Sequence, residues 1–154
     1  MKKLVHAIGY FLLMNLVFIT DRIAKHLALA FEGTETSVLP GISCVYVKNR
    51  GISWSLFYAH STWAFVCVTA LVSIVIGIVG IYTYQRWKQN QAIIGEVFVF
   101  TGAISNVFDR IVHGGVIDFI ECSFRGWYFP VFNIADVAIV IGVGIMLIQF
   151  WRES

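Results

Sequence analysis

The chain has 154 residues, of which 58% are hydrophobic and 13% charged, and its formal net charge is +2. A globule of this size is mostly surface and needs polar residues to cover it, so the composition excludes a water-soluble enzyme. The small net charge also excludes a nucleic-acid binder, which needs a basic surface to follow phosphates. We therefore expect one integral membrane domain over residues 1–154.

Four apolar stretches are long enough, or nearly so, to cross the hydrocarbon core, which takes about 20 residues. We expect these spans at residues 4–20, 62–84, 92–108 and 134–151. The first stretch follows two lysines, as in a cleavable signal peptide, but charged residues separate it from the small residues of a cleavage site. It is therefore expected to be a retained span, and the fold an all-α membrane protein with four transmembrane helices.

Lysine and arginine predict the orientation of these helices. Five of them lie in short segments on one side, whereas six are spread over the longer segments 21–61 and 109–133. Because dense basic charge in short segments marks the cytoplasmic side, we expect both termini and the 86–88 connection to be cytoplasmic. The two long segments are then exported.

Residues 38–58 differ from the apolar stretches. Alternating residues over 42–47, many of them β-branched or aromatic, predict a strand, and Gly41 and Gly51 interrupt the pattern. We expect a small exported β element here. Cys44 and Cys122 would share the exported side and could pair, although their spacing gives no support for a disulfide.

Up-and-down helices bring four polar clusters to one face of the bundle. The clusters are Asp21 with Lys25; Asn106, Asp109 and Arg110; Asp118; and Asn133 with Asp136. Asp21 and Lys25, four residues apart, are interpreted as a structural ion pair or helix-end anchor. Asp109 beside Arg110 could be a simple interfacial pair, and Glu96 is given no role. Asp118 and Asp136 have no basic residue close in sequence, so charge pairing explains them least well.

Two adjacent carboxyl groups in a low-dielectric site share one proton, because both cannot ionise. The ionised group takes a proton from water and the protonated one donates to a carbonyl oxygen, which hydrolyses a peptide bond. No His-Glu-x-x-His or Gly-x-Ser-x-Gly pattern occurs, so we expect neither metal nor cofactor. Ser105 is interpreted as a small packing residue.

Two other classes stay open. A small transporter or proton relay also places carboxylates in the membrane, but it would spread them across the bilayer rather than gather them at one face. A non-catalytic assembly or lipid-binding subunit would keep its function when either aspartate is replaced. A membrane protease of the Gly-x-Gly-Asp type is disfavoured because that motif is absent.

The chain resembles bacterial lipoprotein signal peptidase (signal peptidase II) over nearly its whole length. The resemblance rests on five blocks in the family's order. They are Asp21-Arg22-Ile23-Ala24-Lys25, Asn49-Arg50-Gly51-Ile52-Ser53-Trp54-Ser55, Gly102-Ala103-Ile104-Ser105-Asn106-Val107-Phe108-Asp109-Arg110, Gly115-Val116-Ile117-Asp118-Phe119, and Phe132-Asn133-Ile134-Ala135-Asp136. Ser105, Ile52 and Trp54 depart from the family's Gly, Ala and Phe.

The resemblance implies an aspartic endopeptidase of the bacterial inner membrane with its active site on the exported side. It implies cleavage of diacylglyceryl-modified prolipoproteins before the lipidated Cys, contact with membrane lipid, and inhibition by globomycin. Asp118 and Asp136 would be the catalytic pair. Substrate contacts would come from Asn49, Asn106, Arg110 and Asn133, and structural or accessory roles from Asp21, Lys25, Gly51, Gly102 and Asp109.

Overall fold

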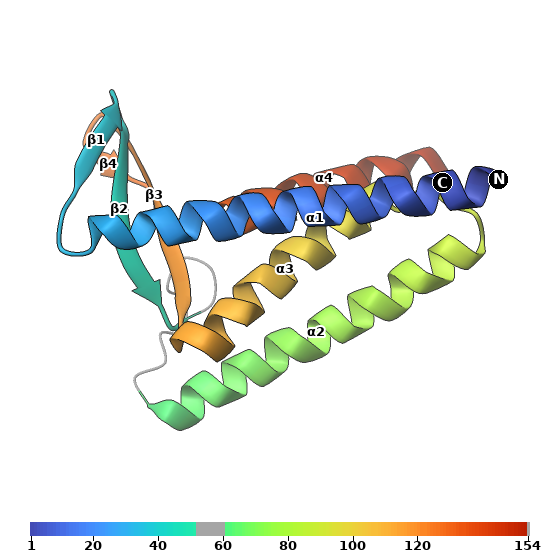
Figure 1. Cartoon of the computed structure of the whole chain (residues 1–154), viewed down its shortest axis with the longest axis horizontal. Helices are drawn as coiled ribbons and strands as arrows, with labels where there is room; N and C mark the ends of the chain where they lie inside the picture. Colours follow the sequence, from blue (N-terminus) through green and yellow to red (C-terminus); the bar gives the residue numbers. More distant parts are fainter. Residues whose placement is uncertain (52–60, 154) are drawn as a thin grey trace.

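The computed structural model describes residues 1–51 and 61–153, which form long helices and a small sheet at one end (Figure 1). The helices are α1 (Lys2–Ala28), α2 (Thr62–Lys88), α3 (Ile94–His113) and α4 (Ile134–Glu153), with a short 3-10 turn, η1 (Leu29–Phe31), after α1. The strands are β1 (Thr36–Leu39), β2 (Ile42–Asn49), β3 (Val116–Phe124) and β4 (Trp127–Tyr128). Both termini lie at the end opposite the sheet.

Three helices of the described chain, rather than the expected four, are long and apolar enough to cross a membrane: α1, α2 and α4. Large apolar side chains on them face outward; in α2, Ile74 and Ile78 are 61% and 60% exposed. Such extended apolar surface needs a non-aqueous partner, which lipid supplies. The expected mostly helical membrane fold with a small β element is therefore confirmed, while the count of four spans is not.

The third helix, α3, differs because its 20 residues include Glu96, Asp109 and Arg110, all of them buried. It packs against α1, α2 and α4. Glu96 forms an ion pair with Arg86 of α2, with 2.7 Å between Arg86 Nε and Glu96 Oε1. A helix whose charged side chains are buried inside the protein is less apolar than its neighbours without exposing those charges to lipid.

Glycines set the close approach of α3 and α4. A Cβ on Gly102 would lie 2.4 Å from the backbone oxygen of Ala135, and one on Gly142 would lie 2.6 Å from that of Gly95. Only a residue without a side chain fits at such backbone contacts, as in small-residue crossings of membrane helices. This crossing holds the last turns of α3 beside the first turn of α4.

The sheet is antiparallel, in the order β1-β2-β3-β4. β2 confirms the strand expected after residue 38, whereas residues 52–58 of that expectation lie outside the described residues. β3 was not predicted, since its segment was assigned to a polar connection. Gly114, in the left-handed conformation with φ of 67°, ends α3 and turns the chain directly into β3. Cys44 and Cys122 are free thiols on the paired strands β2 and β3.

Candidate active site

A buried cluster of charged side chains from α1 and α3 adjoins the first turn of α4. α1 continues beyond residue 20, the expected end of the first span, so Asp21 and Lys25 lie within the helix, both almost fully buried. Lys25 Nζ lies 2.9 Å from Asp21 Oδ2 and 2.8 Å from Asp109 Oδ2. The expected Asp21–Lys25 pair is therefore present, and Asp109 joins it from α3. Buried charges are tolerated when they are paired in this way.

Arg22 and Ser105 complete the cluster, and sequence reasoning assigned neither of them a functional role. Arg22 Nη1 lies 2.5 Å from Asp109 Oδ1, and Arg22 Nη2 lies 3.0 Å from Asp21 Oδ2. Ser105, interpreted from sequence as a packing residue, donates its hydroxyl to Asp21 Oδ2 at 2.6 Å. A simple pair of Asp109 with Arg110 was one interpretation of the sequence, but the ion pairs of Asp109 in the described chain are with Arg22 and Lys25.

The N-terminus of α4 places Asp136. Asn133 precedes the helix and its Oδ1 accepts from the Asp136 backbone N–H at 2.9 Å, while Asp136 Oδ2 accepts from the Asn133 N–H at 3.2 Å. This reciprocal arrangement is a capping box, which satisfies free N–H groups of the first turn. Asp21 Oδ1 accepts from the N–H of Ala135 at 2.9 Å and so ties the charge cluster to the same turn.

Strand β3 places Asp118, which is 2% exposed. Its Oδ2 accepts from Asn49 Nδ2 at 2.9 Å, and its Oδ1 accepts from Asn133 Nδ2 at 2.6 Å. Burial, followed by the nearby charge of Asp136, raises the pKa of Asp118 to about 7, against the opposing effect of the two amide hydrogen bonds. Asp118 therefore holds a proton at neutral pH far more readily than an ordinary aspartate.

The third amide, Asn106 of α3, contacts the other carboxyl group. Its Nδ2 donates to Asp136 Oδ1 at 2.8 Å, and its Oδ1 accepts from Lys25 Nζ at 2.8 Å and from Asn133 Nδ2 at 3.2 Å. Asn49, Asn106 and Asn133, expected to contact substrate, thus donate to the two aspartates. The structure brings together both predicted catalytic residues and all three predicted asparagines.

Arg110 of α3 lies at the same site as the two aspartates and is 5% exposed. One terminal guanidinium nitrogen, Nη2, donates to the backbone oxygen of Gly51, and Arg110 Cζ lies 5.7 Å from the centre of the Phe65 ring. The other, Nη1, is buried and has no hydrogen-bond partner in the described structure. Gly51 also donates its N–H to Asn49 Oδ1 at 2.8 Å. Ile52 and Trp54 of the same block lie outside the described residues.

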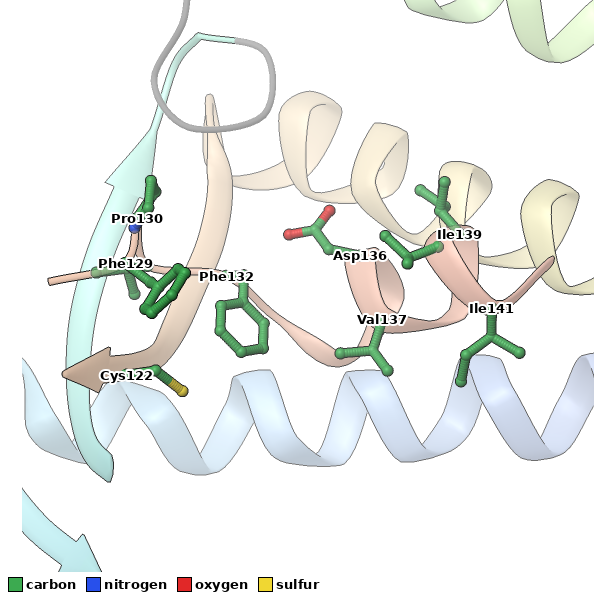
Figure 2. Close-up of a pocket in the computed structure, with 10 residues that line it drawn as sticks. Cys122, Phe129, Pro130, Phe132, Asp136, Val137, Ile139 and Ile141 are labelled. Atoms are coloured by element: carbon green, nitrogen blue, oxygen red, sulfur yellow. The ribbon is translucent and has the colours of Figure 1, made fainter. Parts of the chain in front are cut away.

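Two cavities meet at Asp136. The smaller, of about 110 Å³, is lined by both aspartates together with Asn49, Asn106 and Arg110. The larger, of about 520 Å³, is lined by apolar side chains of α4 and the segment before it, with Asp136 at its wall (Figure 2). The described residues contain no cluster of His, Cys, Asp and Glu that could hold a metal ion. The site presents two carboxyl groups, Asp118 in the smaller cavity and Asp136 in both.

Comparison with known proteins places this arrangement in a family. The family model for signal peptidase (SPase) II matches residues 13–152. A lipoprotein signal peptidase of Blochmanniella pennsylvanica is 41% identical over 79% of this chain and 74% of its own length. One from Listeria monocytogenes serotype 4a is 35% identical over 94% of each chain.

The fold is also found among solved structures. One, described as a bacterial membrane enzyme, superimposes with a TM-score of 0.77 over 94% of this chain and 88% of the other, at 24% identity. At that identity the similarity shows the fold alone. Membership of the family is shown by the family model and by the relatives. The chain therefore belongs to the signal peptidase II family and is a protease with several membrane-spanning helices.

Proposed function

We propose that this chain is an aspartic endopeptidase that removes the signal peptide from diacylglyceryl-modified prolipoproteins, cleaving before the lipidated Cys. The observation that carries the proposal is that Asp118 and Asp136, from different elements, line one cavity and are linked through Asn133. The relatives named lipoprotein signal peptidase support the substrate class.

Asp118 and Asp136 divide the acid and base roles. The raised pKa of Asp118 favours it as the holder of the shared proton, which it donates to the oxygen of the scissile carbonyl. Asp136 takes a proton from water as the water oxygen attacks the carbonyl carbon. The tetrahedral intermediate then collapses: the C–N bond breaks, Asp136 returns its proton to the leaving nitrogen, and Asp118 recovers its own. The pair ends as it began, with one proton.

The three asparagines act as positioning residues. Each donates its amide N–H to a carboxyl oxygen, which fixes the rotamers of Asp118 and Asp136. A misplacement of about 1 Å in such a site costs on the order of a hundredfold in rate. Asn49, Asn106 and Asn133 therefore influence the chemical step, in addition to any contact they make with the substrate.

Arg110 and the two cavities bind the substrate in this proposal. Among the described residues Nη1 of Arg110 has no acceptor, so this charged donor suits a carbonyl oxygen of the bound peptide. The apolar cavity of about 520 Å³ beside Asp136 suits the acyl chains of the lipidated residue, which adjoins the cleaved bond. The antibiotic globomycin, an inhibitor implied by the resemblance, would occupy the same space.

The remaining predicted residues support the site. Asp21, Lys25 and Asp109 form the charge cluster that holds α1, α3 and α4 together. Gly51 supplies the backbone oxygen that orients Arg110, and Gly102 allows α3 to approach the turn that carries Asp136.

We further propose four spans in one domain. α3 has 20 residues, which at 1.5 Å per residue reach across a hydrocarbon core of about 30 Å. The distribution of lysine and arginine supports cytoplasmic termini, with the sheet and both aspartates on the exported side of the inner membrane.

The test uses purified protein in detergent and a lipidated prolipoprotein substrate, with and without globomycin. Asp118→Asn and Asp136→Asn should each abolish cleavage while the protein still inserts and purifies, because each removes one half of the acid–base pair. Glu121→Gln, on the same strand as Asp118 but outside both cavities, is the matched control and should cleave normally. Near-normal turnover in either Asp variant would refute the catalytic assignment.

A further inference from the structure

A separate cavity of about 730 Å³ lies at the far end of the molecule from the aspartates. It is enclosed by the start of α1, the end of α2 and the connection from α2 to α3. Figure 1 places these segments beside both termini, opposite the sheet. Its described lining shares no residue with the two catalytic cavities.

One wall comes from α1. Lys3, His6 and Tyr10 line the cavity, and their spacing of three and four residues places them on one face of the helix. Tyr10 is fixed by two contacts. Its ring packs nearly perpendicular to that of Trp87 with centroids 5.8 Å apart, and its hydroxyl accepts from the N–H of Ile93 at 3.3 Å. The imidazole of His6 lies beside the Tyr10 ring, with centroids 6.5 Å apart.

The connection from α2 to α3 adds two uncharged polar residues to the lining. Asn90, in the left-handed conformation at φ of 60°, and Gln91 bring side-chain amides to the cavity. The lining residues that the structure describes include one lysine and no acidic residue. The nearby Arg86 and Glu96 charges are paired with each other. A cation and several N–H donors without a carboxylate suit an anion rich in oxygen, such as a phosphate ester.

The cavity also has an apolar part that opens to the bilayer. Val5 and Ile94 line it and are 65% and 42% exposed on the outer faces of α1 and α3. Trp and Tyr side chains such as Trp87 and Tyr10 mark the height of lipid headgroups. A free phosphate ion would leave the apolar part unused, whereas a phospholipid fills both parts.

We propose that this cavity binds an anionic phospholipid, with the phosphate at Lys3 and His6 and an acyl chain along Val5 and Ile94. The bound lipid joins α1 to the end of α2. Among the helices the main packing partner of α2 is α3. The bound lipid therefore adds a second link, between α1 and α2, that stabilises the position of α2. The proposal does not depend on the roles of the two aspartates.

The experiment uses the purified full chain in neutral detergent. Native mass spectrometry counts retained lipid, and thermal unfolding measures stability, with phosphatidylglycerol, phosphatidylcholine of the same acyl chains, or inorganic phosphate. We expect retention of one phosphatidylglycerol and a rise in melting temperature, because a ligand that binds only the folded state stabilises it. Phosphatidylcholine and phosphate should each give a clearly smaller effect.

Lys3→Gln and His6→Gln test the site, with Lys88→Gln as the matched control. Lys88 carries the same charge at the same end of the protein, but it packs over Tyr84 outside the cavity. Loss of the Lys3 cation should weaken lipid retention about fivefold, whereas Lys88→Gln should leave it unchanged. An equal loss with Lys88→Gln, equal binding of phosphatidylcholine, or the full effect with phosphate alone would overturn the proposal. Unfolding without lipid shows that each variant is folded.

Discussion

Gly102→Ala should damage catalysis through the spacing of α3 and α4. The new Cβ would lie 2.4 Å from the backbone oxygen of Ala135, whereas nine in ten real Cβ contacts are longer than 3.4 Å. The two helices must therefore separate by about 1 Å at this level, since the obstacle is backbone. Asn106 lies one turn beyond Gly102 and Asp136 directly follows Ala135, so the movement stretches their 2.8 Å hydrogen bond. A displacement of about 1 Å at a catalytic group costs on the order of a hundredfold in rate.

The assay is kcat for cleavage of a lipidated prolipoprotein, measured beside thermal unfolding. Gly144→Ala on α4 is the matched control, because its Cβ would meet nothing within 4 Å. We expect kcat to fall about a hundredfold for Gly102→Ala while the control stays at the wild-type value. A Gly102→Ala variant with normal kcat would show that the spacing of the two helices does not set the position of Asp136.

Three further predictions follow from the site and from the charge pattern. Arg110→Lys should raise KM about tenfold or more with little change in kcat, because it keeps the charge but loses the fork of donors; reduced thermal stability with an unchanged KM would instead indicate a structural role. The raised pKa of Asp118 means that the folded state binds its proton more tightly, so the stability due to this group is complete below about pH 4 and lost as the pH rises through about 7. Melting temperature should therefore fall as the pH rises from about 4 to about 7 and level off above that, and Asp118→Asn should flatten this dependence. In intact cells an impermeant thiol reagent should label a cysteine introduced at Thr34 but not one at Gln89; the reverse pattern would invert the proposed topology.

Helix positions and the gathering of polar clusters could be predicted from the sequence because both depend on local patterns. Apolar stretches mark the helices, and up-and-down connections bring alternate ends together. The end of α1 was less predictable. Asp21 and Lys25 break the apolar pattern, but the helix continues through them because their charges are paired inside the protein.

Strand β3 and the partner of Asp109 could not be predicted for a different reason. Residues Val116–Phe119 are all buried, so they show no alternation of apolar and polar side chains that would indicate a strand. The bond between Arg22 and Asp109 joins residues 87 positions apart, whereas Arg110 is adjacent in sequence. Adjacency in the sequence suggests an ion pair between Asp109 and Arg110. The packing of α1 on α3 instead brings Arg22 to Asp109.

The three asparagines around the aspartates have a consequence for where protons can go. Each amide oxygen accepts a bond from elsewhere: Asn49 from Gly51, Asn106 from Lys25, and Asn133 from the backbone of Asp136. None of these amides can therefore rotate to present its oxygen to a carboxyl group without losing that bond. The asparagines can only donate toward the pair, so a proton on either aspartate has no amide acceptor beside it. With these amides acting as donors, the proton of the pair is directed toward the other carboxyl group, water and the bound peptide, which are the groups that take part in the proposed reaction.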